Sequence, residues 1–255
     1  MDSGVGGLTV VQNLRRILPV EDVLFFGDSA NCPYGNRNED EIFELGMNMI
    51  RSFEREGVKC VVIACNTIST VVDRFRRETN LQLFSIVEST AKYVAGMGVD
   101  SAGLIATERV VKSGIFERSL NKEMPDFRLA AQGSHELAAL IDGGIVEGAA
   151  VETEIRACVD KIIAAGGRDR LILGCTHYPI VADVFSKCYP ELTLIDASRA
   201  QAEAVSDWLR ENSLLRTGHE GTLTIRTSGG RENYERVCAL LGISEGTQIQ
   251  TVESL

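Results

Sequence analysis

Hydrophobic residues in the first quarter of the chain recur at helical spacing between polar positions. From Ile42 to Phe53 they return every three or four residues, which places them on one face of a helix. Asn38 and three acidic residues precede this stretch, and Gly57 follows it. A side-chain cap, acids in the first turn and a terminal glycine are the usual boundary signals of a helix. The pattern therefore predicts a helix between Asn38 and Gly57.

Short apolar runs between such stretches predict buried strands. Residues 60–65 (CVVIAC) and 170–174 (RLILG) have the character of parallel strands that are covered on both faces. Similar runs predict strands at residues 22–27, 83–87, 102–107, 128–131, 192–195, 222–227 and 248–252. Further helices are expected at residues 8–18, from about 70, from about 89, from about 113, and at 147–165, 201–209 and 232–241.

This alternation of strands and helices defines the fold class. Strands separated by helices of ten or more residues form parallel βαβ units, so we expect an α/β protein with mainly parallel sheets flanked by helices. The chain has no linker rich in proline and serine. Any domain border is therefore expected in a short crossing, near residues 87–89 and again near 196–198.

Composition narrows the classes of function. The 255 residues include 26 Lys plus Arg and 36 Asp plus Glu, which gives a net charge of -10. An acidic chain without a basic cluster lacks the electrostatic footprint of a nucleic-acid or membrane-surface binder. We therefore expect a small-molecule substrate as partner, with no nucleic acid and no membrane. No apolar run reaches the roughly 18 residues of a membrane span, and a cytoplasmic protein is expected.

Two of the seven cysteines repeat one local pattern. In VVIACNTIS (residues 61–69) and LILGCTHYP (residues 171–179), an apolar strand ends in a small residue, a cysteine and a polar run. Ligand sites in open α/β sheets lie at the carboxyl ends of strands. Cys65 and Cys175 are therefore expected at a site in a cleft between two similar domains. No C-x-x-C pair indicates a zinc site or a redox dithiol.

The neighbours of each cysteine supply groups that a reactive thiol needs. Asn66 and Thr67 follow Cys65, while Thr176 and His177 follow Cys175. Backbone N–H groups at a strand-to-helix turn, together with hydroxyl and amide donors, stabilise a thiolate. An imidazole can also exchange a proton with the sulfur. The repeated pattern favours two functional thiols over two cysteines that merely fill a core.

Two further motifs are rich in glycine. DSGVGG (residues 2–7) leads into the first expected helix, where its carboxylate and hydroxyl suit the ammonium and carboxylate groups of a substrate. It fails the G-x-G-x-x-G fingerprint at Thr9, which makes a nucleotide-binding protein the weakest alternative. GDSANCPYG (residues 27–35) follows an expected strand, where proline and glycine fix a rigid loop.

In this order and at these separations, DSGVGGLTV, GDSANCPYG, ACNT and GCTHYP closely resemble the glutamate racemases of the aspartate/glutamate racemase superfamily. The resemblance implies conversion of L-glutamate to D-glutamate for peptidoglycan synthesis, without a cofactor or a metal. It also implies two α/β domains that face each other across the cleft, residues 1–88 plus 198–255 and residues 89–197. A homodimer is expected. None of the motifs contains a lysine that would bind pyridoxal phosphate.

The resemblance implies a role for each motif residue. One thiolate of the pair Cys65 and Cys175 would remove the α-proton, and the opposite thiol would protonate the other face. Asp2 and His177 are expected to assist Cys65 and Cys175 respectively. The expected substrate-binding residues are Ser3, Pro33, Tyr34, Gly35, Asn66, Thr67 and Thr176, and the expected supporting residues are Asp28 and Asp142.

Several positions depart from the family pattern. Val110 stands where a threonine is expected, Phe116 where a tyrosine is common, and Asp142 where a glutamate is expected. Residues 132–135 (QGSH) replace the usual Cys-Pro. Loss of a hydroxyl donor costs about 1–3 kcal/mol when it leaves a charged acceptor unpaired. Two alternatives follow: another acidic amino acid as substrate, or a catalytically weak homologue that binds or regulates.

The start of the sequence also differs from the family pattern. Family members carry a short strand before the Asp-Ser-Gly motif, and only Met1 precedes Asp2 here. We expect either further residues before Met1, which the pattern favours, or an unfilled position in the first sheet. An unfilled position would cost buried contacts and ladder hydrogen bonds.

Overall fold

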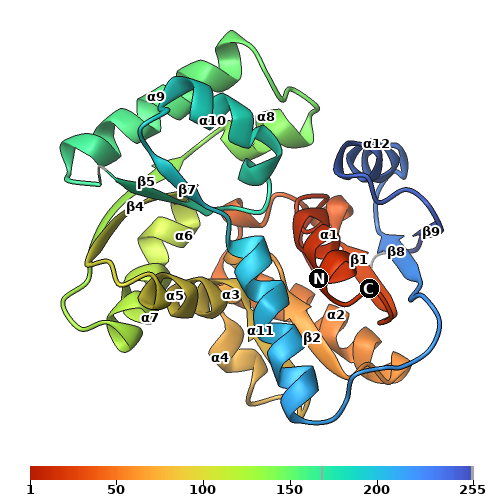
Figure 1. Ribbon diagram of the computed structural model, residues 1–255. Helices are drawn as coiled ribbons and strands as arrows, with labels where there is room; N and C mark the ends of the chain where they lie inside the picture. The colour runs from red at the N-terminus through yellow and green to blue at the C-terminus, as the bar shows by residue number, and fades with distance from the viewer. Residues whose placement is uncertain (168, 254–255) are drawn as a thin grey trace.

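Parallel sheets organise the computed structural model, which describes residues 1–167 and 169–253 (Figure 1). The strands are β1 Val23–Gly27, β2 Cys60–Ile63, β3 Gln82–Ser85, β4 Ser101–Thr107, β5 Arg128–Ser134, β6 Arg170–Gly174, β7 Thr193–Ile195, β8 Leu223–Thr227 and β9 Thr247–Thr251. They form a sheet of order β1-β8-β9, a pair β2-β3 and a four-stranded sheet of order β5-β4-β6-β7. All the described strand pairs are parallel, which confirms the α/β class.

Helices connect and cover these strands. They are α1 Leu8–Ile17, α2 Glu39–Glu56, α3 Asn66–Ser69, α4 Val72–Phe75, α5 Ile86–Gly96, α6 Glu108–Ser113, α7 Ile115–Glu123, α8 Leu137–Asp142, α9 Ala149–Ala164, α10 Ala182–Cys188, α11 Ala197–Glu211 and α12 Glu232–Leu241. The predicted limits of α2 are confirmed. The Asn38 side chain accepts from the Glu41 N–H in a capping box, and Gly57 ends the helix with a φ of 69°.

Short helices are the least predictable elements. The helix expected from about residue 70 is two short helices, and the first of them, α3, already begins after Cys65. The helix expected from about residue 113 is α7, which Gly114, with a φ of 63°, separates from the unexpected α6. The sequence pattern predicts neither α8 nor α10. Helices of four to seven residues contain too few turns to give a hydrophobic period.

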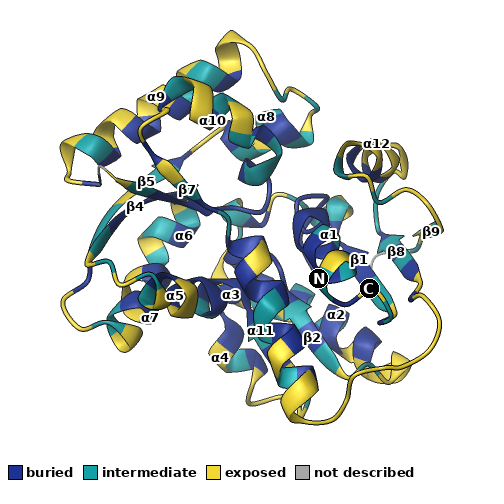
Figure 2. Ribbon diagram, viewed as in Figure 1, coloured by how far each residue is buried: buried dark blue, intermediate teal, exposed yellow. Residues whose placement is uncertain are grey.

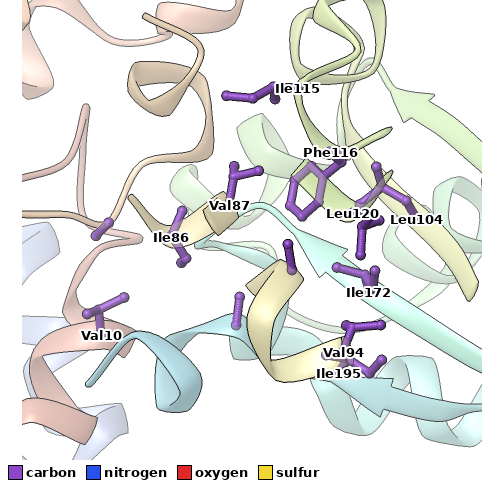
Figure 3. Close-up of a cluster of buried hydrophobic side chains, with 14 of the residues drawn as sticks. Val10, Ile86, Val87, Val94, Leu104, Ile115, Phe116, Leu120, Ile172 and Ile195 are labelled. Atoms are coloured by element: carbon purple, nitrogen blue, oxygen red, sulfur yellow. The ribbon is translucent and has the colours of Figure 1, made fainter. Parts of the chain in front are cut away.

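The four-stranded sheet is covered on both faces. Leu104 of β4 and Ile172 of β6 pack with α5 and α7 in one cluster, which Figure 3 shows around Phe116. Their neighbours Ile105 and Leu171 pack with α8, α9 and α10 in a second cluster. Because successive residues of a strand point to opposite faces, two covered faces require the continuous apolar runs seen in the sequence.

The C-terminal strands return to the first sheet. β8 and β9 extend the sheet that begins with β1, whereas residues 101–195 supply the whole four-stranded sheet. Figure 2 shows buried residues along the sheets and exposed residues on the outer sides of α9 and α12. The domain limits 1–88 plus 198–255 and 89–197 stay a prediction.

Met1 and Asp2 lie between β1 and β2, which are edge strands of two different sheets. The Met1 ammonium donates to the Val62 carbonyl (2.8 Å), and the Ala64 N–H donates to the Met1 carbonyl (3.0 Å). On its other side, Asp2 forms a parallel bridge with Gly27. The two residues therefore fill the carboxyl-terminal end of the sheet position that was expected before the Asp-Ser-Gly motif.

A cavity of about 450 Å³ opens next to Met1, between β1 and β2. Leu24 and Val62 line it from the two strands, Leu14 from α1 and Leu209 from α11. Leu24 and Val62 are only half-buried, because each lies on a strand at the edge of its sheet. Neither Cys65 nor Cys175 lines this cavity. The cavity is therefore separate from the cysteine site.

Candidate active site

Cys65 lies directly after β2 and caps the N-terminus of α3. Its sulfur accepts a hydrogen bond from the Ile68 N–H (3.5 Å) and lies 3.6 Å from the Ser3 hydroxyl oxygen. Burial raises the pKa of the Cys65 thiol to about 12, and the charge of Asp2 adds to this rise. The hydrogen bonds from Ile68 and Ser3 act in the opposite direction, because they stabilise the thiolate.

Cys175 lies directly after β6 and has an imidazole beside it. Its sulfur is 3.7 Å from His177 Nδ1, and His177 Nε2 is 3.4 Å from Asp142 Oδ1. Burial would lower the pKa of His177, but its hydrogen bonds to Asp142 and Cys175 and the charges around it raise that pKa to about 10. The hydrogen bond to His177 in turn lowers the pKa of Asp142. His177 is therefore set to carry a proton at neutral pH.

The structure brings the two cysteine loops together. The Thr176 hydroxyl, next to Cys175, donates to the Asp2 carboxylate (3.1 Å). A Cβ atom at Gly6 would lie 2.5 Å from Thr176 Oγ1, so this approach requires a glycine. Cys175 is also among the groups that raise the pKa of Cys65. The two thiols therefore share one buried electrostatic environment.

Asp2 contacts the half of the site that contains Cys175. Its carboxylate accepts hydrogen bonds from the Gly4 N–H and from Thr176, and Ser3 is the neighbour of the Cys65 sulfur. Burial raises the pKa of Asp2, while the charge of His177 opposes this rise. Asp2 therefore acts on Cys65 through its charge, without a hydrogen bond to the sulfur among the described contacts.

Polar groups without partners lie next to Cys65. Asn66 is 3% exposed, and neither its amide nitrogen nor its amide oxygen has a hydrogen-bond partner among the described residues. The Thr67 hydroxyl is 3.5 Å from the hydroxyl of Thr107, which ends β4. Buried polar atoms are normally satisfied, so the Asn66 amide is available to a ligand. The sequence reasoning missed Thr107, although its position at a strand end was a usable signal.

The loop after β1 is held by Asp28. The Asp28 carboxylate, 4% exposed, accepts hydrogen bonds from the hydroxyls of Tyr34 (2.6 Å) and Ser228 (2.6 Å). Pro33 and Gly35 flank Tyr34 in this loop, and a Cβ atom at Gly35 would lie 4.0 Å from Thr107. Asp28 thus fixes the loop beside the site. The contribution of Ser228, 200 residues away in sequence, could not be predicted.

Val110 and Phe116, two of the positions that depart from the family pattern, are each 1% exposed and belong to the same hydrophobic cluster. Figure 3 shows Phe116 in this cluster. The Ser134 hydroxyl, at the end of β5, donates to Glu154 (2.8 Å) and accepts from the Leu137 N–H at the start of α8.

The described residues contain no group of three or more His, Cys, Asp or Glu side chains that could hold a metal ion. Across the same residues, no helix has the length and apolar character needed to cross a membrane.

The fold is that of an α/β enzyme, with a buried cysteine at a strand end in each of two parallel sheets. A family model described as Asp/Glu/Hydantoin racemase matches residues 7–205. The glutamate racemase of Carboxydothermus hydrogenoformans is 37% identical over 218 residues, 84% of this chain and 80% of that protein. The chain therefore belongs to the Asp/Glu/hydantoin racemase family, which confirms the resemblance seen in its motifs.

Solved structures give the same result. A glutamate racemase from Francisella tularensis, crystallised with D-glutamate, superimposes with a TM-score of 0.89 at 28% identity, covering 100% of this chain and 95% of that one. The aspartate racemase of Picrophilus torridus reaches a TM-score of 0.57 at 18% identity over 83% of this chain and 92% of its own. That second likeness shows the fold alone.

Proposed function

We propose that the protein interconverts L- and D-glutamate by moving the α-proton between Cys65 and Cys175. The observation that carries the proposal is the pair of buried thiols from two different sheets, each at a strand end and each with its own proton-handling neighbours. The glutamate racemases among its relatives support glutamate as substrate. By the same resemblance, D-glutamate made here would supply peptidoglycan synthesis.

The two thiols begin the reaction in different protonation states. Protonated His177 donates from Nδ1 to the Cys175 sulfur and from Nε2 to Asp142, so that it can stabilise negative charge on that sulfur during the reaction. Buried Cys65, beside the charge of Asp2, keeps its proton. The Cys175 thiolate removes the α-proton from one face, and Cys65 delivers its own proton to the other. The product is inverted, and the reverse reaction restores the first state.

Hydroxyl and amide groups would bind the substrate. The unpartnered Asn66 amide and the Thr67 and Thr176 hydroxyls offer donors for the two carboxylates, and we add Thr107 to this set. Ser3 and the loop of Pro33, Tyr34 and Gly35 would complete the pocket, with Asp28 holding that loop. Asp142 would support His177.

Proton NMR in D2O tests the proposal. The protein is incubated with L-glutamate, and separately with L-aspartate, while the α-proton signal and the configuration are followed. Loss of the glutamate signal with appearance of D-glutamate is the expected result. Reaction of L-aspartate alone would mean that aspartate, and not glutamate, is the substrate. Binding of glutamate without any exchange would overturn the proposal in favour of a binding or regulatory homologue.

The remaining features of the proposal concern the cellular setting. Seven free cysteines suit a reducing compartment, which supports a cytoplasmic location. The family resemblance supports a homodimer. Sedimentation of the purified protein tests the homodimer, because a monomer at micromolar concentration would contradict it.

A further inference from the structure

Arg236 of α12 reaches across to the end of α8. Its Nη2 donates to Asn233 of its own helix (3.1 Å) and lies 3.5 Å from the carbonyl oxygen of Asp142. A Cβ atom at Gly144 would lie 2.1 Å from Arg236 Nη1, so the guanidinium rests directly on a glycine. Figure 1 shows α12 next to β8, with α8 to the left of α12 in the other part of the molecule. Arg236 therefore links the first sheet's C-terminal helix to the four-stranded half.

The position of this contact gives it a physical consequence. α8 ends at Asp142, and the last carbonyl groups of a helix lack partners within the helix. A cation at this end satisfies such a carbonyl and interacts favourably with the helix dipole. Arg236 thus caps α8 from outside and holds its last residue in place.

Asp142 connects this helix end to the proposed chemistry. Its Oδ1 is 3.4 Å from His177 Nε2, and His177 Nδ1 is 3.7 Å from the Cys175 sulfur. An aspartate is one methylene shorter than a glutamate, so its reach to His177 depends on where α8 ends. Any shift of that end is transmitted to the imidazole, and no comparable chain of contacts leads from Arg236 to Cys65 among the described residues.

We propose that Arg236 is a positioning residue for the Cys175 half of the site. By holding the end of α8, it keeps Asp142 on His177 and so keeps the imidazole in place beside Cys175. This inference rests on the proposed racemase function for its effect on catalysis, but its effect on His177 is independent of substrate.

The charged groups that face His177 determine whether loss of the Arg236 contact raises or lowers the pKa of His177. They are Asp142 from α8, Cys175 on its own loop and Asp2 from the N-terminal segment. Asp142 is the strongest of the groups that raise the pKa of His177, and the described contact of Arg236 on this side is with Asp142. Release of Asp142 therefore lowers the pKa of His177.

The test compares Arg236→Ala with Arg236→Lys and Arg231→Ala. Lysine keeps the cation, and Arg231 is a matched control because it is exposed near the start of α12 and pairs with Glu235. We expect Arg236→Ala to lower kcat/KM about two- to fivefold, the range of a cation at a helix end. NMR titration should show the pKa of His177 lowered by about 0.3 to 0.7, which corresponds to the same two- to fivefold change in proton affinity. Arg236→Lys should restore most of both values, and Arg231→Ala should change neither.

A second variant separates positioning from general loosening. In an Asp142→Asn background, Arg236→Ala should leave the His177 titration unchanged, because the link is already broken. An unchanged or higher pKa of His177 in Arg236→Ala, with the fold intact by circular dichroism, would overturn the inference. If the wild-type protein fails to exchange the α-proton of glutamate but Arg236→Ala still lowers the pKa of His177, the proposed function fails and the positioning role stands.

Discussion

The two thiols of the site occupy equivalent positions in their sheets but have different surroundings. Cys65 is contacted by a hydroxyl and a helix N–H, and burial raises its pKa to about 12. Cys175 is contacted by His177, whose pKa is raised to about 10. In the proposed reaction, the Cys65 half of the site therefore holds a proton on sulfur and the Cys175 half holds one on imidazole.

The carboxylate Asp2 makes this asymmetry sharper. By analogy with His177 it is expected to assist Cys65, yet its direct partner across the site is Thr176. An ionised Asp2 raises the pKa of Cys65 and also favours protonated His177. One charge thus keeps the proton on Cys65 and the proton on His177. The resting state proposed above follows from this common influence.

Loss of either thiol should have the largest effect on activity. Cys65→Ser and Cys175→Ser should each lower kcat/KM by about 10³-fold or more, because each removes an acid/base group that the reaction requires. The assay is circular dichroism of glutamate, with Cys188→Ser as a control on a half-buried cysteine in α10.

The two enantiomers have equal free energies, so kcat/KM must fall equally in both directions for each variant. Any difference between the two halves therefore appears in the α-deuterium isotope effects, measured separately with L- and D-glutamate. Activity within tenfold of wild type in either serine variant would contradict the two-thiol mechanism.

Variants of the residues that contact each sulfur should show whether the Cys65 and Cys175 halves of the site differ. His177→Asn takes away the proton donor next to Cys175 and should lower kcat about 10²-fold, within the range of general acid/base groups. Ser3→Ala takes away one neutral hydrogen bond to the Cys65 sulfur, worth about 1 kcal/mol, and should lower kcat about fivefold. Steady-state kinetics at pH 8 measures both. Equal losses in the two variants would show that the halves do not differ in the way proposed.

Alkaline pH should weaken the Cys175 half of the folded protein. The pKa of His177 is about 10 against 6.5 in the unfolded chain, so its contribution to stability is complete below pH 6.5. That contribution is lost as the pH rises from 6.5 to 10. It amounts to a few kcal/mol, because each tenfold gain in proton affinity on folding corresponds to roughly 1.4 kcal/mol before relaxation. Urea unfolding at several pH values measures it.

His177→Asn is the control for this titration. The difference in unfolding free energy between wild type and variant should shrink as the pH rises, because only wild type carries the raised imidazole pKa. A difference that is constant between pH 6.5 and 10 would mean that His177 is not protonated in the folded protein.

Much of this arrangement could be predicted from local sequence. The strands were predictable because buried parallel strands are continuous apolar runs, and both cysteines because each follows such a run. The contacts that distinguish the two halves join distant residues: Asp2 with Thr176, 174 positions apart, and Arg236 with Asp142, 94 apart. No periodicity encodes such pairs. The expected loss of a donor at Val110 stays a prediction. Its burial could not be predicted, because the face of a six-residue helix cannot be assigned from its sequence.

The sheets behind the two thiols should also differ in their response to added volume. Val62 of β2 lines the cavity beside Met1, so Val62→Ile places one more methyl group in open space. Burial of a CH2 group contributes about 0.8 kcal/mol, and we expect the free energy of unfolding to rise by about 0.5–1 kcal/mol. Val159 of α9 is 0% exposed in the cluster behind Cys175, and Val159→Ile should cost about 1–3 kcal/mol through overpacking. Both variants make the same chemical change, so urea midpoints compare the two packings directly. A loss of stability in Val62→Ile as large as that in Val159→Ile would mean that the first sheet closes over the cavity in solution.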